Sequence, residues 1–431
     1  MPNSIDASGL NRRDILKLSI GGATALWLGS SVFALAQAAS IKAGWYGGQD
    51  THDRMQKAIA LFTKQNPDIA VDVEYAAFAD FYDRLPVEYQ GGAAPDMHRH
   101  SMTYLFDYIK RGLLSDLAPF VGKEIDITKV YPGVVDIGRD GDQIHAIGNN
   151  QIAVGLFYNK AKVEAAGANA LDNLTWDAYR DLAIKIGKAG GPNYYGTNDG
   201  GGFFGFFELF VTQRGKSLYS GDNALGFEPK DLTDWLAYWQ SLRAEQGAPP
   251  PALTAEAVGF QNAPIVKNQA AMQVGWNQQL VFYQALTQDE LDIHSCPIPA
   301  DAKDNGHLIR ALDFWVIPES SQNKQPAAKL INFLLNDPQA IEVLGLTLGG
   351  PASDAAGAIL SKTADAPSKK VLGYLTDLRA KAPMAQPRWI SGQGELEALL
   401  GRLNAQVGFQ QVTPEAATDN FFSEAQRILG A

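Results

Sequence analysis

Cysteine is almost absent from this sequence, which has a single one, Cys296, among 431 residues. One cysteine excludes an intrachain disulfide framework and any zinc site or iron–sulfur cluster built from cysteines. Basic residues are also in deficit, since 36 lysines and arginines stand against 47 aspartates and glutamates, a net charge of -11. An acidic surface repels phosphate backbones and anionic lipid, so we expect no binding to nucleic acid or to a membrane surface.

Three common catalytic motifs are missing as well. The sequence has no HExxH, no G-x-S-x-G and no P-loop, which removes the commonest zinc, serine-hydrolase and nucleotide chemistries. A glycosidase with two carboxylates leaves no such motif, because the spacing of its catalytic pair along the chain is not fixed. The composition is that of a globular protein, and the length predicts two or three domain-sized units.

The first 38 residues have the pattern of an export signal. Arg12 and Arg13 precede a mildly apolar stretch, residues 18–35, and small residues in two A-x-A patterns follow at 34–36 and 36–38. This segment resembles a bacterial twin-arginine (Tat) signal peptide. A transmembrane anchor is the alternative, but three glycines and three serines make the stretch a poor membrane span. With no cysteine after the small residues, we expect a cleaved, unlipidated protein in the periplasm.

After the signal, segments typical of strands and helices alternate. Residues 41–45 and 69–75 favour strands, and the helix between them carries Met55, Ile59 and Phe62 at helical spacings. Residues 152–158 form a near-continuous apolar run, as in a strand buried on both faces. The alternation predicts an α/β fold with mainly parallel sheets that helices cover on both faces.

Short segments spread over nearly the whole mature chain carry a family resemblance. Among them are Asn66-Pro67-Asp68, Ala94-Pro95-Asp96, Gly112-Leu113-Leu114, Leu156-Phe157-Tyr158-Asn159, Thr175-Trp176-Asp177 and Met272-Gln273-Val274-Gly275-Trp276. Their order and spacing resemble those of the extracellular solute-binding proteins of family 1, the maltose-binding-protein-like carbohydrate receptors of ABC importers. The chain departs from the family at residues 146–148, where Ala-Ile-Gly replaces a frequent Ala-Leu-Pro next to the hinge.

The resemblance implies a two-lobed periplasmic binding protein fold of type II, with the ligand held in the cleft between the lobes. It assigns residues 39–149 and 299–347 to the N-terminal lobe, and residues 150–298 and 348–431 to the C-terminal lobe. Crossings between the lobes are expected near residues 148–151, 296–299 and 349–351. It also implies closure about these hinges when a ligand contacts both lobes.

Sugar binding requires aromatic rings that stack on sugar faces, and planar polar groups that bind hydroxyls. Candidates come from predicted strand ends, where parallel sheets bind ligands, and from positions where the family presents cleft residues. They are Trp45, Gln49, His52, Asp96, Asn150, Trp276, Asn277, Asp313, Arg388 and Trp389. Each also has a structural alternative, such as a core side chain, a helix cap or a hinge contact. Arg388 or Arg310 in the cleft would favour an acidic sugar.

Other patterns are weaker indications of function. The aromatic run Phe203–Phe207 favours a helix core over a cleft wall, and Cys296 has the pattern of a small buried residue. His98 and His100 lack a third metal ligand, while Tyr194 and Tyr195 lie in a loop, so we expect neither a metal nor a cofactor. The prediction is a monomeric sugar receptor that delivers its ligand to an ABC permease. A Tat-exported carbohydrate enzyme, or a receptor for a polyamine or metal, is the alternative.

Overall fold

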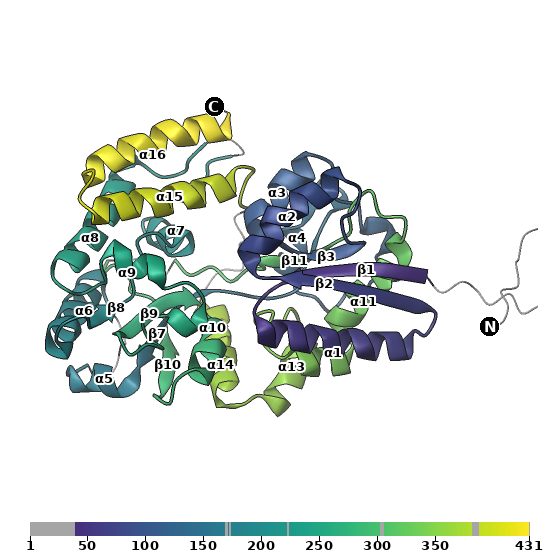
Figure 1. Cartoon of the computed structure of the whole chain (residues 1–431), viewed down its shortest axis with the longest axis horizontal. Coiled ribbons are helices and arrows are strands. Elements are labelled where there is room, and N and C mark those ends of the chain that lie inside the picture. Colours follow the sequence, from purple (N-terminus) through teal and green to yellow (C-terminus); the bar gives the residue numbers. More distant parts are fainter. Residues whose placement is uncertain are drawn as a thin grey trace, which may run out of the picture. The chain divides into compact units, whose positions relative to one another are not determined.

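The computed structural model describes residues 39–168, 171, 174–221, 224–301, 306–381 and 388–430. The predicted signal peptide, residues 1–38, lies outside them. Within these ranges no helix has both the length and the apolar character that a membrane crossing requires. The described chain folds around two main sheets, each with helices packed on it (Figure 1).

Five strands build the first sheet: β1 (Ala39–Tyr46), β2 (Ile69–Ala76), β3 (Met97–Ser101), β6 (Ile147–Gly148) and β11 (Asp313–Val316). They lie in the order β2-β1-β3-β11-β6. β1 is parallel to β2 and β3, whereas β11 is antiparallel to β3 and β6. We call this sheet and the helices around it the first lobe.

Four strands build the second sheet: β7 (Val154–Asn159), β8 (Tyr195–Thr197), β9 (Ala270–Trp276) and β10 (Leu291–His294). Their order is β10-β7-β9-β8, with β7 antiparallel to both neighbours and β8 parallel to β9. This sheet and its helices are the second lobe. A two-stranded hairpin of β4 (Arg139–Asp140) and β5 (Gln143–Ile144) precedes the passage into it.

Strand direction follows from where the chain enters each sheet. β7 is the first strand after the chain leaves the first sheet, and β11 is the first after it returns. These two strands therefore run away from the junction of the lobes, while their neighbours run toward it. The α/β class is as predicted, but the expectation of mainly parallel sheets is corrected: the first sheet is mixed and the second is largely antiparallel.

Two bridges join the segments that link the lobes. Gln151 forms an antiparallel bridge with Gly350, and Ile152 forms one with Arg310. The Gln151 amide is 2.9 Å from the Gly350 carbonyl oxygen, and the Ile152 amide is 2.8 Å from that of Arg310. The three crossing segments are thus hydrogen-bonded to one another, so that a movement of one displaces the others.

One predicted crossing is wrong. Residues 296–299 do not pass between the lobes, because Ile298 still bridges Thr175 at the start of a second-lobe helix. The chain returns to the first lobe through residues 309–312 and enters β11 at Asp313. Cys296 accordingly lies buried within the second lobe and not in a crossing.

The helices divide according to the elements that they contact (Figure 1). Those of the first lobe are α1 (Gln49–Gln65), α2 (Phe78–Gln90), α3 (Met102–Lys110), α4 (Pro132–Asp136), α11 (Lys324–Asn336) and α12 (Pro338–Leu344). Those of the second are α5 (Lys160–Ala165), α6 (Trp176–Gly190), α7 (Phe204–Thr212), α8 (Pro229–Ala244), α9 (Pro251–Glu256), α10 (Gln279–Ala285), α14 (Ala366–Lys381), α15 (Gln393–Gly408) and α16 (Pro414–Leu429). Between them, α13 (Asp354–Thr363) contacts both α12 and α14.

Local sequence signals account for several boundaries. α1 buries Met55, Ile59 and Phe62, the predicted face, and ends one residue before the Asn66-Pro67 stop. α6 begins after Thr175, whose hydroxyl accepts a hydrogen bond from the Ala178 amide at 3.1 Å, so the predicted N-cap is confirmed.

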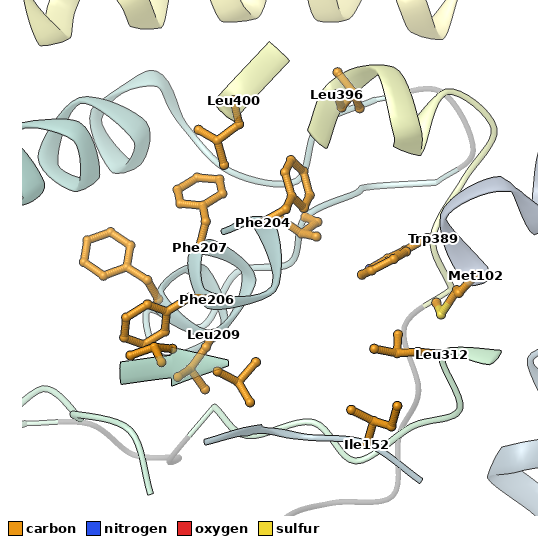
Figure 2. Packing of buried hydrophobic residues seen from close by; sticks show 14 of the residues in the cluster. Met102, Ile152, Phe204, Phe206, Phe207, Leu209, Leu312, Trp389, Leu396 and Leu400 are labelled. Carbon is orange, nitrogen blue, oxygen red and sulfur yellow. The ribbon is translucent and has the colours of Figure 1, made fainter. Parts of the chain in front are cut away.

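The largest hydrophobic cluster extends across the two lobes. It includes Met102 of α3, Leu312 of the returning crossing, the phenylalanines of α7, and Trp389 before α15. Figure 2 shows Trp389 with Met102 on one side and Phe204 on the other. Phe206 and Phe207 are fully buried, so the core interpretation holds for this half of the aromatic run, whereas Phe203 and Phe204 border the space between the lobes. The space that remains between the lobes is bordered by this cluster.

Candidate functional site

A cavity of about 680 Å³ lies between the two lobes. Its volume is within the range of small-molecule sites, about 300–1,000 Å³. The first lobe contributes the ends of β1 and β3 and the first turns of α2 and α3. The second contributes the end of β9 and the first turns of α7, α10 and α15. Strand ends and helix N-termini from both lobes therefore face one space, as in ligand sites of α/β proteins.

The lining of the cavity is rich in aromatic rings. Eight are present: Tyr46, Phe78, Tyr104, Phe203, Phe204, Phe260, Trp276 and Trp389. Trp276 ends β9, and the edge of Phe203 meets its ring at a centroid distance of 4.9 Å. Gly205 makes room for this indole, because a Cβ there would lie 2.5 Å from its Cη2 atom. Rings held in this way offer flat apolar faces to a ligand.

Asp313, at the start of β11, is the centre of a polar network on the first-lobe side. One carboxylate oxygen accepts hydrogen bonds from Arg99 Nη2 and Asn150 Nδ2, each at 2.8 Å, and the Tyr46 hydroxyl donates to the other. Burial, with the charge of Asp313 beside it, raises the pKa of Tyr46 well above its usual value, which keeps this hydroxyl a donor. The network ties β1, β3 and the crossings together and neutralises Asp313.

A second ion pair lies behind the cavity. Arg310 donates from Nη1 to Glu208 Oε1 at 2.9 Å, and its Nη2 binds the other carboxylate oxygen. The ring of Trp389 lies over the guanidinium at 4.8 Å, and its Nε1 is 3.4 Å from Glu208. Both charged side chains are about 97% buried, with residue exposures of 3% and 2%. Arg310 is therefore neutralised by Glu208. An arginine that is already paired with a carboxylate does not favour an acidic sugar as the ligand.

Glu397 of α15 differs from both pairs because it lines the cavity without a counter-ion among the described residues. Gln393 Nε2 donates to its Oε1 at 2.9 Å. Burial, reinforced by the nearby charge of Glu208, raises the pKa of Glu397 to about 7.

The start of α15 contacts the first lobe. Asp107 of α3 accepts hydrogen bonds from the Ser391 hydroxyl at 2.6 Å and from the Gly392 amide at 3.1 Å.

Three of the ten predicted site residues line the cavity: Trp276, Asp313 and Trp389. A fourth, Asn150, is fully buried behind them. Its side chain binds Asp313, the Leu348 carbonyl and the Leu312 amide, so it orders the crossings. The remaining six predicted residues do not line the cavity.

The structure places Trp45 of β1, and Gln49 and His52 of α1, outside the cavity. Trp45 is fully buried, and its Nε1 donates to His52 Nδ1 at 3.2 Å on the face covered by α1. Gln49 is exposed and donates to Asp53 at 2.7 Å. The strand extends one residue further than predicted, so that Tyr46 points into the cavity in place of Trp45.

Asp96 and Asn277 also lie outside the cavity, in contrast to the prediction. Asp96 lies at the beginning of β3 and not at an end that faces the cavity, and it binds the Lys42 amide and Ser321 at 2.9 and 2.6 Å. Asn277 is fully buried, and its Oδ1 accepts a hydrogen bond from the Ala153 amide at 2.9 Å. The next residue, Gln278, lines the cavity instead, with an Oε1 atom that has no partner in the described part of the chain.

Arg388 is placed outside the cavity. Its side chain is exposed, and the guanidinium lies over the ring of Phe106 of α3 at 4.8 Å. It therefore makes a contact between the lobes and no contact with the space that a ligand would occupy. Arg99, which was not predicted, is the arginine that lines the cavity.

The residues missed from the sequence are Tyr46, Arg99, Gln278 and Glu397. Arg99 had an available signal: it alternates with His98 and His100 in a strand, so its side chain must point away from theirs. Both histidines are fully buried, and His98 bonds the Tyr89 hydroxyl at 2.8 Å. Over the described ranges, no group of three His, Cys, Asp or Glu side chains could hold a metal ion.

Comparisons with known proteins agree with this fold. The model of the bacterial extracellular solute-binding protein family matches residues 48–341. A family 1 extracellular solute-binding protein from Alicyclobacillus acidocaldarius is 25% identical, with a TM-score of 0.68, and the match covers 91% of this chain and 99% of that one. A periplasmic oligogalacturonide-binding protein from Yersinia enterocolitica, solved with saturated digalacturonic acid, is 20% identical with a TM-score of 0.80 and the same coverage.

A third solved structure, an ABC transporter solute-binding protein from Thermotoga lettingae with bound α-D-tagatose, is 19% identical with a TM-score of 0.76. That match covers 91% of this chain and all of the other. Together the three structures confirm the predicted two-lobed fold.

Proposed function

We propose that this chain, which belongs to the bacterial extracellular solute-binding protein family, is the receptor of an ABC importer and binds a sugar or sugar derivative between its lobes. The observation that carries the proposal is the aromatic lining of the cavity between the lobes. Aromatic faces of this kind stack on the apolar faces of sugar rings, while Gln278 brings to the cavity wall an amide group that can bind a hydroxyl.

The proposed mechanism is hinge closure. A solute that contacts Trp276 of the second lobe and the Tyr46 and Tyr104 side of the first would favour the arrangement in which the lobes meet. The three hydrogen-bonded crossings are the hinge in this proposal. The closed surface would then be recognised by the membrane permease, whose partner subunits hydrolyse ATP, since the sequence has no P-loop.

Membership of an extracellular family implies an exported protein. We further propose that export follows the twin-arginine route, with a cleaved and unlipidated signal in residues 1–38. The route carries folded proteins, and a protein with one cysteine has no need of an oxidising compartment to fold. Replacement of Arg12 and Arg13 by lysine should leave the protein in the cytoplasm, which fractionation would detect. Unchanged periplasmic yield would contradict this route.

Trp276→Ala tests the binding site. Removal of the stacking indole should weaken sugar binding by about 2 kcal/mol, as for a desolvated aromatic anchor, measured by calorimetry. Phe409→Ala is the matched control, because Phe409 follows α15 and is 52% exposed. The control should retain full affinity. Equal affinity in both variants would remove Trp276 from the site.

The same sugars distinguish a receptor from an exported enzyme. A receptor raises the melting temperature of the protein and returns its ligand unchanged, whereas an enzyme releases product. A screen of neutral, amino and acidic sugars by thermal shift, followed by chromatography of the incubated sugar, gives both readouts. Product formation by the wild type that Trp276→Ala abolishes would favour the enzyme.

A further inference from the structure

The charges around the cavity do not balance. Among the residues that the structure describes, three charged side chains line it: Arg99, Asp313 and Glu397. Arg99 and Asp313 neutralise each other at 2.8 Å, and Arg310 behind the wall is matched by Glu208. Each arginine that could attract an anion is thus already paired with a carboxylate. The charge that is left over is the negative one of Glu397.

We propose that the solute is a sugar carrying an amino group, and that Glu397 is the residue that selects it by pairing with the ammonium. The proposal rests on the proposed sugar-binding function and names its substrate class. A carboxylate surrounded by aromatic faces is a chemical match for an ammonium, because ring faces attract cations and a charged acceptor strengthens the hydrogen bond. An acidic sugar would meet an unbalanced negative charge and no free cation.

The position of Glu397 supports this role. It lies one turn into α15, near the contacts of Asp107 with Ser391 and Gly392 that hold the start of this helix against the first lobe. A group bound to Glu397 is therefore close to both lobes. Ammonium binding there would stabilise the same contact between the lobes that transport requires.

The titratable groups that face Glu397 come from four elements. Tyr104 of α3 and Tyr219 of the loop after α7 are neutral in the physiological range, because burial and the charge of nearby carboxylates raise the pKa of each phenol. Glu208 of α7 opposes ionisation of Glu397, and Arg310 of the crossing favours it. With a pKa of about 7 for Glu397, its ionised fraction falls by roughly fifteenfold between pH 7 and pH 5.5. Affinity for an amine should fall by the same factor.

Matched sugars test the proposal. Gluco-, galacto- and manno-pyranoses are compared by calorimetry at pH 7, each as the hydroxyl sugar, the 2-amino and 6-amino sugars, and the uronic acid. We expect an amino sugar to bind roughly tenfold or more tighter than its hydroxyl counterpart, and the uronate to bind weakest. Glu397→Gln keeps the side-chain shape and should abolish the amine preference and its pH dependence. Glu395→Gln, on the exposed side of the same helix, is the matched control and should change neither.

Each outcome is decisive. The tightest binding by a uronate, or equal binding of amine and hydroxyl sugars, overturns the proposal and leaves sugar binding intact. Retention of the amine preference in Glu397→Gln, with an unaltered circular dichroism spectrum, overturns the role of Glu397. Putrescine serves as an amine without a sugar ring: its binding in the absence of any sugar binding would overturn the proposed function and retain the ammonium site. Binding of none of these probes overturns both proposals.

Discussion

The two walls of the cavity are built in different ways. The first-lobe wall combines three of the aromatic rings with a charged network in which Asp313 is bonded to Tyr46, Arg99 and Asn150. The second-lobe wall consists of aromatic rings, an amide oxygen without a protein partner, and a carboxylate without a counter-ion in the described chain. Groups that are satisfied by the protein stabilise the fold, whereas groups left unsatisfied are available to a ligand. We therefore expect substitutions in the Asp313 network of the first wall to lower the free energy of unfolding. Substitutions in the second wall should lower the affinity for the sugar.

The largest effect is expected from Asp313→Ala. This change leaves Arg99 buried without its counter-ion and should cost about 3–5 kcal/mol of the free energy of unfolding, measured in urea. The double variant Arg99→Met with Asp313→Leu removes both charges and should recover a large part of that loss. A loss below about 1 kcal/mol in the single variant would show that the network does not hold the first wall together.

A smaller effect, on the second wall, is expected from Gly205→Ala. The added methyl group would collide with the indole of Trp276 and displace it, so sugar affinity should fall by roughly tenfold, or about 1.4 kcal/mol. Gly401→Ala is the control: a Cβ there meets nothing within 4 Å inside α15. It should raise stability by about 0.5–1 kcal/mol and leave affinity unchanged. Equal affinities would mean that the position of Trp276 is not set by this contact.

The smallest effect is expected from Glu397→Gln in the absence of ligand. Since the folded-state pKa of about 7 lies above the usual value of a glutamate, the folded protein holds a proton that the unfolded chain releases. Wild-type stability should therefore decline as pH rises from about 6 to 8, and about 1 kcal/mol of that decline should be absent from the variant. Urea denaturation at both pH values measures it. If the stabilities of the wild type and the variant changed equally with pH, the pKa of Glu397 would not be raised in the folded protein.

The fold was more predictable from the sequence than the site. The helix face of α1 and the cap at Thr175 depend on short patterns of apolar and capping residues, and these patterns are local. Trp276 could also be predicted, because it ends a buried strand. The strand directions were not, because they depend on where the chain passes from one sheet to the other. That passage leaves no periodic signal in the sequence.

Some of the errors within the site are displacements by one residue. A strand places successive side chains on opposite faces, so an error of one residue exchanges a cavity residue for a core residue. This happened at Trp45, where Tyr46 faces the cavity; in the turn after β9, Gln278 lines the cavity and Asn277 is buried. Glu397 had no signal of this kind: it is an acidic residue in an amphipathic helix. Only the tertiary contacts of α15 show that it is enclosed.

The position of β11 has a consequence for biosynthesis. This strand lies between β3 and β6 in the first sheet, yet it is made after every strand of the second. The ribosome must therefore complete residues 313–316 before the amino-terminal half of the protein can close its sheet, so the first lobe cannot fold ahead of the second during translation. Late, non-local strand insertion is intrinsically slow. A nascent chain halted near residue 300 should thus expose the edge of β3 and need protection by a chaperone until synthesis ends.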